Sequence, residues 1–249
     1  MSLLSKIQNH WGLNEGSGTI TTDGFGGRDG TLTDAALWEA AGKIDGGIAN
    51  DGTTSRYISV SDLPFPTTGA ISFWLKTAST NRQNILSFAG NITYLRFAAN
   101  YQPGTAGGTP GAIGFQRQSA SGAPAFAFRS DVGTALHDGD WHHIVVNFNT
   151  QNAGSPEIYF DGVAQSVTVS ASNLLDGQTF DAAIGSAVTG ATPGDNLNGS
   201  LDALMLFDDM LTAGEVAQLY SGGVGLELVA DLRLYTAYTV AAGRLRRIS

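Results

Sequence analysis

The segment from Glu157 to Val169 constrains the fold of this chain more than any other. Two runs rich in β-branched and aromatic residues, 157–160 and 163–169, stand on either side of the dipeptide Asp161-Gly162. A two-residue Asp-Gly between such runs predicts a tight hairpin, because both turn positions require positive φ angles. We therefore expect consecutive strands of this chain to pair antiparallel.

Three further stretches carry a strand signature. Residues 70–76 and 200–207 are apolar on both faces, as in the interior of a sandwich, and residues 141–148 are β-branched and aromatic. The 33 glycines and the 14% of charged residues indicate many turns and short strands rather than disorder. An all-β sandwich of roughly 200–250 residues commonly forms one domain, so we expect a single one.

One helix is expected before the C-terminal tail, over residues 212–220. Thr212 and Glu215 have the spacing of a capping box, in which each side chain satisfies an amide of the first turn. Gly222-Gly223 then ends the helix. No linker divides the first part of the chain, so residues 1–224 are predicted to form one domain and residues 225–249 a separate tail.

Charge and composition exclude several classes of protein. The net charge of −9 disfavours binding to nucleic acid or to anionic membrane surfaces. The chain has no cysteine, and no apolar run approaches the ~20 residues that a membrane span needs. The N-terminus lacks a basic stretch followed by an apolar one, so we expect a protein made without a secretion signal.

The tail differs in charge from the rest of the chain. It carries Arg233, Arg244, Arg246 and Arg247 against two acidic residues, whereas the remainder has nine basic residues against 20 acidic ones. The tail is also too apolar for a solvated linker. We expect it to dock onto its own domain, a neighbouring subunit or another acidic protein. Assembly is favoured, so a homo-oligomer or other assembly proteins are the predicted partners.

Short motifs follow one another from Trp11 to Tyr220. They include Trp11-x-Leu13-Asn14-Glu15-Gly16, Arg28-Asp29-Gly30, Asn50-Asp51-Gly52, Asp140-Trp141-His142-His143 and Asn198-Gly199-Ser200-Leu201-Asp202. In this order they resemble laminin G-like domains of the concanavalin A-like lectin/glucanase superfamily. The resemblance implies a two-sheet antiparallel jelly-roll sandwich with one short C-terminal-side helix, and the tail lies outside it. Such folds host many functions.

The resemblance also implies a structural Ca²⁺. It places Asp51, in a Gly-rich turn, and Asp202, at the start of a late strand, together at the sandwich edge as metal ligands. Ca²⁺ takes six to eight oxygen ligands from carboxylates and backbone carbonyls. The alternative is that Asp51 shapes an Asx-type turn before Gly52 and that Asp202 caps a strand end.

Histidines and aromatic residues supply the other candidate sites. His142 and His143 are adjacent on a predicted strand, so their side chains point to opposite faces and cannot chelate one metal together. We expect them to be packed or hydrogen-bonded. Tyr101, in the loop 100–111, and Trp38 are candidate platforms for glycan binding, with Phe25 as a third. In the alternative, Trp38 covers the core and Tyr101 pins its loop.

The sequence lacks the patterns of the common hydrolases. A glycosidase needs two carboxylates about 5–10 Å apart. In the hydrolases of this superfamily they stand at alternate positions of one strand, and no such run occurs here. No Gly-x-Ser-x-Gly nucleophile motif occurs either. We therefore expect a non-catalytic module and not an enzyme.

Three functions remain in order of preference. The first is a virus or phage particle protein, a head decoration or tail-fibre component that binds surface glycans. The missing secretion signal favours this first function, for which the predicted location of the chain is the virion. The second is a secreted or cell-surface calcium-dependent lectin or adhesin. The third is a divergent glycoside hydrolase, which requires that carboxylates distant in sequence converge.

Overall fold

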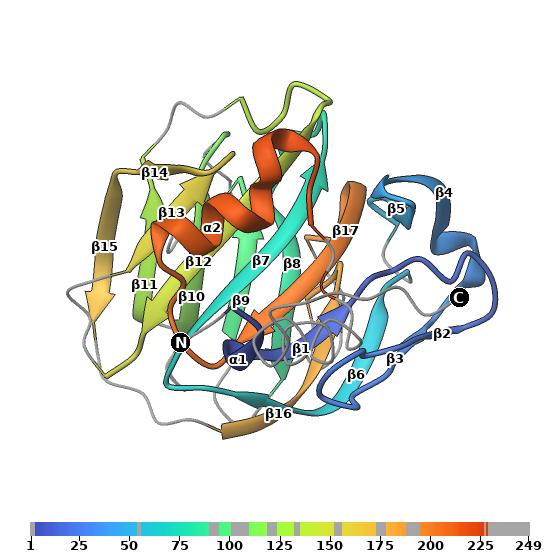
Figure 1. Ribbon diagram of the computed structural model, residues 1–249, viewed down its shortest axis with the longest axis horizontal. Coiled ribbons are helices and arrows are strands. Elements are labelled where there is room, and N and C mark those ends of the chain that lie inside the picture. The colour runs from blue at the N-terminus through green and yellow to red at the C-terminus, as the bar shows by residue number, and fades with distance from the viewer. Residues whose placement is uncertain are drawn as a thin grey trace, which may run out of the picture.

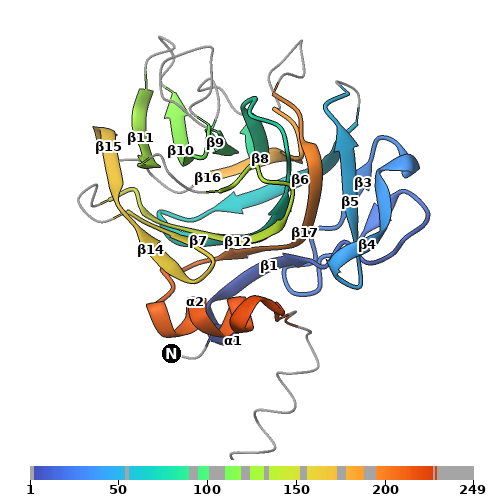
Figure 2. The same cartoon turned by 90° about the horizontal axis from the view of Figure 1, so that it is seen from above.

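The computed structural model describes residues 3–53, 56–89, 95–100, 110–118, 124–131, 135–151, 156–172, 178–187, 195–226 and 228. In these ranges the strands form two antiparallel sheets of eight and nine strands, packed face to face (Figures 1 and 2). Sheet A runs β14 (Val163–Gln165), β13 (Glu157–Phe160), β12 (Trp141–Asn149), β7 (Thr68–Lys76), β17 (Asn198–Phe207), β5 (Gly46–Asp51), β4 (Trp38–Ile44), and β1 (Ile7–Trp11) also pairs with β17.

Sheet B completes the sandwich. It runs β15 (Val167–Ser172), β11 (Pro124–Ser130), β10 (Ile113–Gln118), β9 (Leu95–Ala99), β8 (Gln83–Ala89), β16 (Gln178–Ile184), β6 (Ile58–Phe65), β3 (Gly30–Leu32), β2 (Ile20–Thr21). The described helices are α1 (Leu3–Lys6) and α2 (Ala213–Tyr220), with 3₁₀ turns at Ala35–Leu37 and Ser221–Gly223. The predicted jelly-roll sandwich is confirmed.

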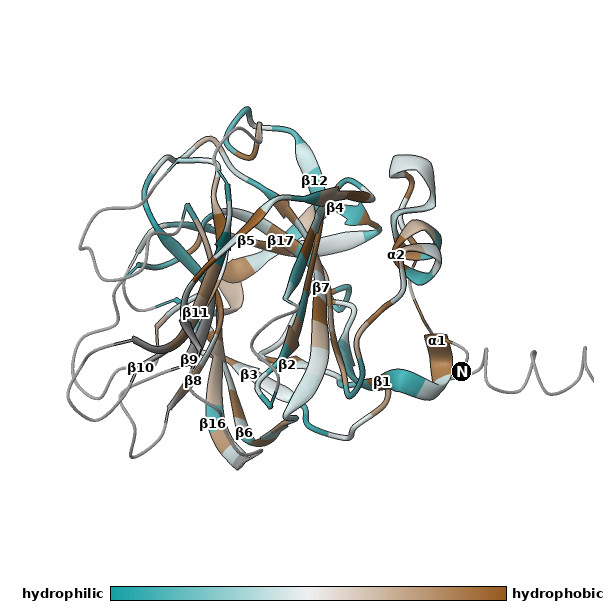
Figure 3. Ribbon diagram, turned by 90° about the vertical axis from the view of Figure 1, so that its left-hand side faces the viewer, coloured by the Kyte–Doolittle hydropathy of each residue, from teal (hydrophilic) through white to brown (hydrophobic). Residues whose placement is uncertain are grey.

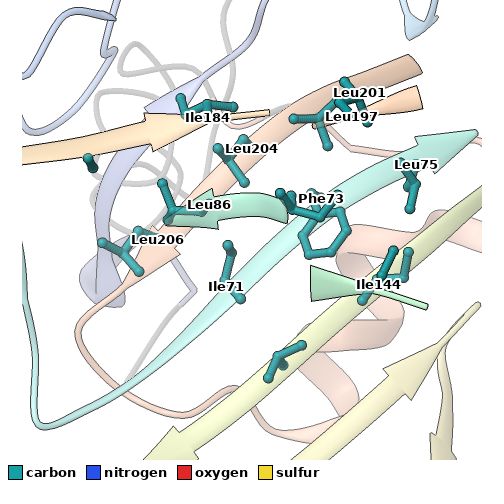
Figure 4. Packing of buried hydrophobic residues seen from close by; sticks show 14 of the residues in the cluster. Ile71, Phe73, Leu75, Leu86, Ile144, Ile184, Leu197, Leu201, Leu204 and Leu206 are labelled. Carbon is teal, nitrogen blue, oxygen red and sulfur yellow. The ribbon is translucent and has the colours of Figure 1, made fainter. Parts of the chain in front are cut away.

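The main core fills the space between the two sheets. Leucine, isoleucine and phenylalanine side chains of the central strands β7, β12 and β17 meet those of β8 and β16 (Figure 4). At one side of it the rings of Phe65 and Phe148 stack with centroids 5.0 Å apart, and Phe115 stacks on Phe148 at 5.7 Å. Large aromatic side chains bury much apolar area, so the main core supplies most of the hydrophobic stabilisation of the fold.

A second apolar cluster covers the opposite face of sheet A. Trp74, Met205 and Phe207 point away from the main core and pack beneath Val216 and Leu219 of α2. Figure 3 shows both helices lying beside the same sheet. We call this group the outer cluster. Sheet A is buried on both faces, so its central strands β7, β12 and β17 are buried at nearly every position instead of at alternate ones.

Buried polar contacts fasten α2 and its preceding loop to sheet A. Asn147 exchanges two hydrogen bonds with the backbone of Leu211: its amide donates to the carbonyl at 2.7 Å, and its oxygen accepts the N–H at 3.0 Å. The buried Lys6 donates to the Met210 carbonyl at 2.7 Å and to Glu215 at 3.0 Å. Glu215 also accepts the N–H of Thr212 at 2.8 Å, which confirms the predicted capping box.

The hairpin around Asp161-Gly162 is confirmed, but its second strand differs from the prediction. Both turn residues have positive φ angles, 50° and 78°. The expected strand 163–169 divides at Ser166 into β14, which pairs with β13 in sheet A, and β15, which pairs with β11 in sheet B (Figure 2). The chain crosses from sheet A to sheet B at Ser166, because the residues before it pair with β13 and the residues after it pair with β11. The one-turn helix α1 was also not predicted.

The first residues of the tail pack on the domain. Leu226 donates its N–H to the Leu219 carbonyl at 3.1 Å, and Leu228, 3% exposed, belongs to the outer cluster. The arginines Arg233, Arg244, Arg246 and Arg247 lie outside the described residues, and their role in assembly stays a prediction. Within the part of the chain that the structure describes, no helix is long and apolar enough to cross a membrane.

Lys6 has two acidic partners, Glu215 and Asp209, and we predict that losing Glu215 lowers the free energy of unfolding much more than losing Asp209. Replacing Glu215 with alanine should lower the free energy of unfolding by about 3 kcal/mol, because a buried ammonium loses its nearest carboxylate and α2 loses half of its capping box. Asp209→Ala is the matched control. Its side chain is 41% exposed and 3.4 Å from Lys6, so its loss should stay below about 1 kcal/mol. Urea unfolding measures both, and equal losses would contradict this account.

Candidate functional site

An open depression lies at the rim of the sandwich, where β7 ends and β17 begins. Its volume is about 630 Å³. The residues that line it are Lys76, Thr77, Ala78, Ser79, Thr80, Asn81, Gly139, Asn198, Gly199 and Ser200. We call it the rim depression. It brings together three segments that are far apart in the sequence. Apart from Ala78 and the glycines, its lining residues carry amide or hydroxyl side chains, and Lys76 carries an ammonium.

A buried hydrogen-bond network fixes the floor of the rim depression. The Thr77 hydroxyl donates to the Asn198 carbonyl at 2.6 Å and accepts from the Gln83 amide at 3.0 Å. The oxygen of Gln83 accepts the N–H of Asn198 at 2.7 Å. Gly199 has a φ angle of 147°, and a Cβ there would overlap the Lys76 carbonyl oxygen. Only glycine therefore lets β17 approach the end of β7 this closely.

Asn100 ties the neighbouring loop to the wall of the depression. Its buried amide donates to the carbonyls of Ser79 and Asn81 at 2.6 and 3.1 Å, and its oxygen accepts the N–H of Gly111 at 2.8 Å. One side chain therefore connects residues 79–81 with Gly111. Tyr101, the predicted glycan platform, lies outside the described residues, and its role stays a prediction.

The structure does not bring the two predicted calcium ligands together. Asp51 is opposite Asn198 in the pairing of β5 with β17, whereas Asp202 lies four residues further along β17. Four residues of strand correspond to about 13 Å, so the expectation that they meet at the sandwich edge is wrong. The register of β17 separates them, which no local motif encodes.

Each aspartate has a local role. Asp51 is exposed and accepts hydrogen bonds from the backbone N–H and hydroxyl of Thr53, which is an Asx turn. Hydrogen bonds from Thr53 lower its pKa. Asp202 is fully buried inside β17, not at its start, and accepts the N–H of Ile44 at 2.7 Å. Among the described residues no cluster of three or more His, Cys, Asp or Glu is arranged to hold a metal ion.

Trp38 lies on β4, away from the rim depression. It is partly buried against the main core, and its indole N–H donates to the Gly18 carbonyl at 2.8 Å. This placement matches the alternative in which Trp38 covers the core, and its role in glycan binding stays a prediction. Phe25 is partly buried against the outer cluster, with its ring centroid 6.1 Å from that of His10.

The outward face of sheet B carries a row of small and polar residues. Ser87 on β8 and Ala127 on β11 lie between core-facing neighbours, and Gln116 on β10 follows the core residue Phe115 and pairs with Ala127, so these side chains point away from the core. All three are buried, with at most 1% of their surface exposed. They therefore offer no accessible surface, and the rim depression is the better candidate.

The two adjacent histidines point to opposite faces of sheet A, as predicted. His143 lies under α2, bonded to the Ser72 hydroxyl at 2.9 Å and packed against Trp74 with ring centroids 5.1 Å apart. Burial lowers the pKa of His143 to about 4. His142 stacks on Phe160 at 4.6 Å and bonds two carboxylates. The expectation of packed and hydrogen-bonded histidines is confirmed.

Comparison with models of protein families identifies the family. The model described as the concanavalin A-like lectin/glucanases superfamily matches residues 51–217. This chain belongs to that superfamily. The resemblance predicted from the sequence motifs is thereby confirmed. No match was found among curated proteins.

Solved structures share the fold at low sequence identity. Domain 4 of the extracellular arabinanase AbnA from Geobacillus stearothermophilus, in complex with arabinotriose, has a TM-score of 0.60 at 15% identity over 89% of this chain and 98% of that one. The binding domain of Paraclostridial Mosquitocidal Protein 1 reaches 0.64 at 13% identity over 88% of this chain, which spans about half of that solved chain (52%). The Ruminococcus gnavus sialidase module CBM40, bound to α2,3 sialyllactose, reaches 0.50 at 14% identity over 70% and 96% of the two chains.

The buried histidines predict a loss of stability in acid. Burial lowers the pKa of both His10 and His143 to about 4. Between about pH 4 and the ordinary value of about 6.5 the unfolded chain binds more protons, so stability falls as pH falls through this window. His143→Gln, which stays neutral, should reduce the loss between pH 7 and 4.5 by about 2 kcal/mol. Urea unfolding at both pH values measures this, and equal losses in both proteins would contradict it.

Proposed function

We propose that this chain is a non-catalytic glycan-binding module and that the rim depression receives the sugar. The observation that carries the proposal is an open depression of about 630 Å³ with amide and hydroxyl groups on its wall. Ligand sites of small molecules commonly measure about 300–1,000 Å³. Its size therefore suits an oligosaccharide of a few residues.

The chemistry of the lining fits sugar hydroxyls. A hydroxyl both donates and accepts hydrogen bonds, and so do the carboxamides of Asn81 and Asn198 and the hydroxyl of Thr80. These three residues are exposed at the depression. The backbone beneath them is held by Thr77, Gln83 and Asn100, so binding orders few protein groups and loses little entropy.

The charge of the molecule favours neutral glycans. Residues 1–224 hold nine basic residues against 20 acidic ones. An acidic body repels anionic ligands at long range. Lys76 is the charged member of the described lining, and its ammonium donates to sugar oxygens as well as to an anion. We therefore propose a neutral oligosaccharide as the ligand class.

Similar folds with bound sugars support a binding role. AbnA domain 4 was solved with arabinotriose and the CBM40 module with sialyllactose. The arabinanase is extracellular, which agrees with the alternative placement of this chain outside the cell. Placement in a virus particle stays a prediction from the sequence. The rival, a divergent hydrolase, needs two carboxylates at a scissile bond, and assays for released sugar test it.

The depression can be tested with a glycan array, followed by calorimetry on the neutral and sialylated oligosaccharides that bind. The full chain should bind neutral oligosaccharides. The double variant Asn81→Ala/Asn198→Ala should lose affinity by about tenfold or more, since each lost hydrogen bond contributes about 1 kcal/mol. Gln165→Ala on the edge strand β14 is the control and should bind normally. Binding that survives the double variant would place the site elsewhere, and a preference for sialylated glycans would overturn the ligand class.

The family resemblance implied a structural Ca²⁺ with Asp51 and Asp202 as ligands. Because Asp202 lies apart, the proposal that we keep is an ion at Asp51 alone. Asp51 lies beside Asn198 of the rim depression, so an ion there would stiffen its edge. Added Ca²⁺ should then raise the melting temperature, EGTA should reverse the rise, and Asp51→Asn should abolish it. A melting temperature that is indifferent to Ca²⁺ would contradict the proposal.

A further inference from the structure

His142 is held between two carboxylates at the same end of the sandwich as the rim depression. Its Nδ1 lies 2.8 Å from Oδ2 of Asp161, and its Nε2 lies 3.0 Å from Oδ1 of Asp138. Its side chain is 11% exposed and stacks on Phe160. The ring therefore contacts a carboxylate at each of its two nitrogens.

This geometry specifies the protonation state of His142. An ionised carboxylate only accepts hydrogen bonds, so each ring nitrogen must donate one. Neutral imidazole carries a single N–H, and only the imidazolium has two. Hydrogen bonds also fix the carboxylates: Asp161 accepts the N–H of His143 at 2.9 Å, and Asp138 accepts that of Asp140 at 2.8 Å.

The carboxylate of Asp138 connects His142 to the rim depression. Asp138 belongs to the turn that precedes β12, and the next residue, Gly139, lines the depression. The N–H of Gly139 donates to the Thr77 carbonyl at 3.1 Å, which attaches the turn to the end of β7. The side chain of Asp138 is 40% exposed and that of Asp161 27%, so Asp138 is the partner freer to move.

We propose that His142 is a positioning residue of the rim depression: as an imidazolium it holds the Asp138–Gly139 turn in place, and glycan affinity falls when it deprotonates. The proposal rests on glycan binding at the depression. On losing a proton, one ring nitrogen becomes an acceptor facing a carboxylate oxygen. Asp161 stays bonded to β12 through the N–H of His143, whereas the other bond of Asp138, from the N–H of Asp140, lies within the turn itself. The turn then keeps the Gly139–Thr77 hydrogen bond but loses its attachment to His142, so its position is less firmly fixed.

The electrostatic surroundings favour the charged ring. Burial opposes the charge, but the hydrogen bonds and negative charges of Asp161 and Asp138 outweigh it and raise the pKa of His142 above its ordinary value. Other titratable groups on the described elements around the ring are His137 and Asp140 on the same turn, His143 on β12, which also interacts with Asp161, and Lys76 on β7, which pairs with Trp141. We call the hydrogen bonds of His142 to Asp161 and Asp138 the clamp. The stability that the clamp contributes is present below about pH 6.5 and is lost as pH rises through the raised pKa of His142.

The first measurement is a ¹⁵N NMR titration of the full chain without ligand. Both ring nitrogens of His142 should carry protons at about pH 6, and the amide resonance of Gly139 should shift with the same midpoint as the ring, above about pH 6.5. A singly protonated ring at about pH 6, or a Gly139 amide whose resonance does not follow the titration of the ring, would overturn the clamp whether or not any glycan binds.

The second measurement is affinity against pH for the tightest oligosaccharide on the array. Wild-type affinity should fall by about fivefold or more from roughly pH 6 to pH 9. His142→Gln should bind weakly at every pH, because its amide cannot donate to both carboxylates. His142→Arg, which keeps its charge and several donors, should bind well across the range.

The outcomes separate the two proposals. If no oligosaccharide binds at any pH, glycan binding fails while the NMR result still decides the clamp. If the ring and Gly139 titrate together but wild-type affinity does not change with pH, the coupling to the depression is wrong. A pH-dependent His142→Arg variant would likewise overturn the role of the imidazolium.

Discussion

The burial of sheet A on both faces is the constraint on which the rest of this structure depends. One face forms the main core with sheet B and the other carries the outer cluster under α1 and α2. The helices and loops that cover a sheet face bring polar backbone groups into the interior, and these groups must find hydrogen-bond partners there. Asn147, Lys6 and Glu215 meet that demand, since their contacts replace the water that Leu211, Met210 and Thr212 would otherwise bind.

This double burial also holds in place the end of the molecule that carries the rim depression. The central strands β7 and β17 are immobilised from both sides, and the rim depression forms where they emerge from the sandwich. The side chains on its wall project from a fixed backbone, with Thr77 and Gln83 satisfying the strand ends beneath. A binding surface of this kind needs little ordering when a ligand arrives.

Some of this could be predicted because it depends on neighbours in the sequence. Asp161-Gly162 requires positive φ angles at both positions, Thr212 and Glu215 are one helical turn apart, and His142 and His143 must point to opposite faces of a strand. Local geometry decides each of these. The family resemblance, in contrast, placed Asp51 and Asp202 together wrongly, because the distance between them depends on the register of β5 against β17.

The sequence by itself determined the sandwich: alternating and doubly apolar runs, turn glycines and one capped helix are compatible with little else. Tertiary structure alone decided the candidate site. The rim depression joins residues 76–81, Gly139 and 198–200, whose proximity follows from strand pairing and not from any motif. The charge of His142 likewise depends on Asp161, 19 residues further along the chain. Long-range pairing is chosen by the burial of the whole chain at once, which is why a local pattern cannot reveal it.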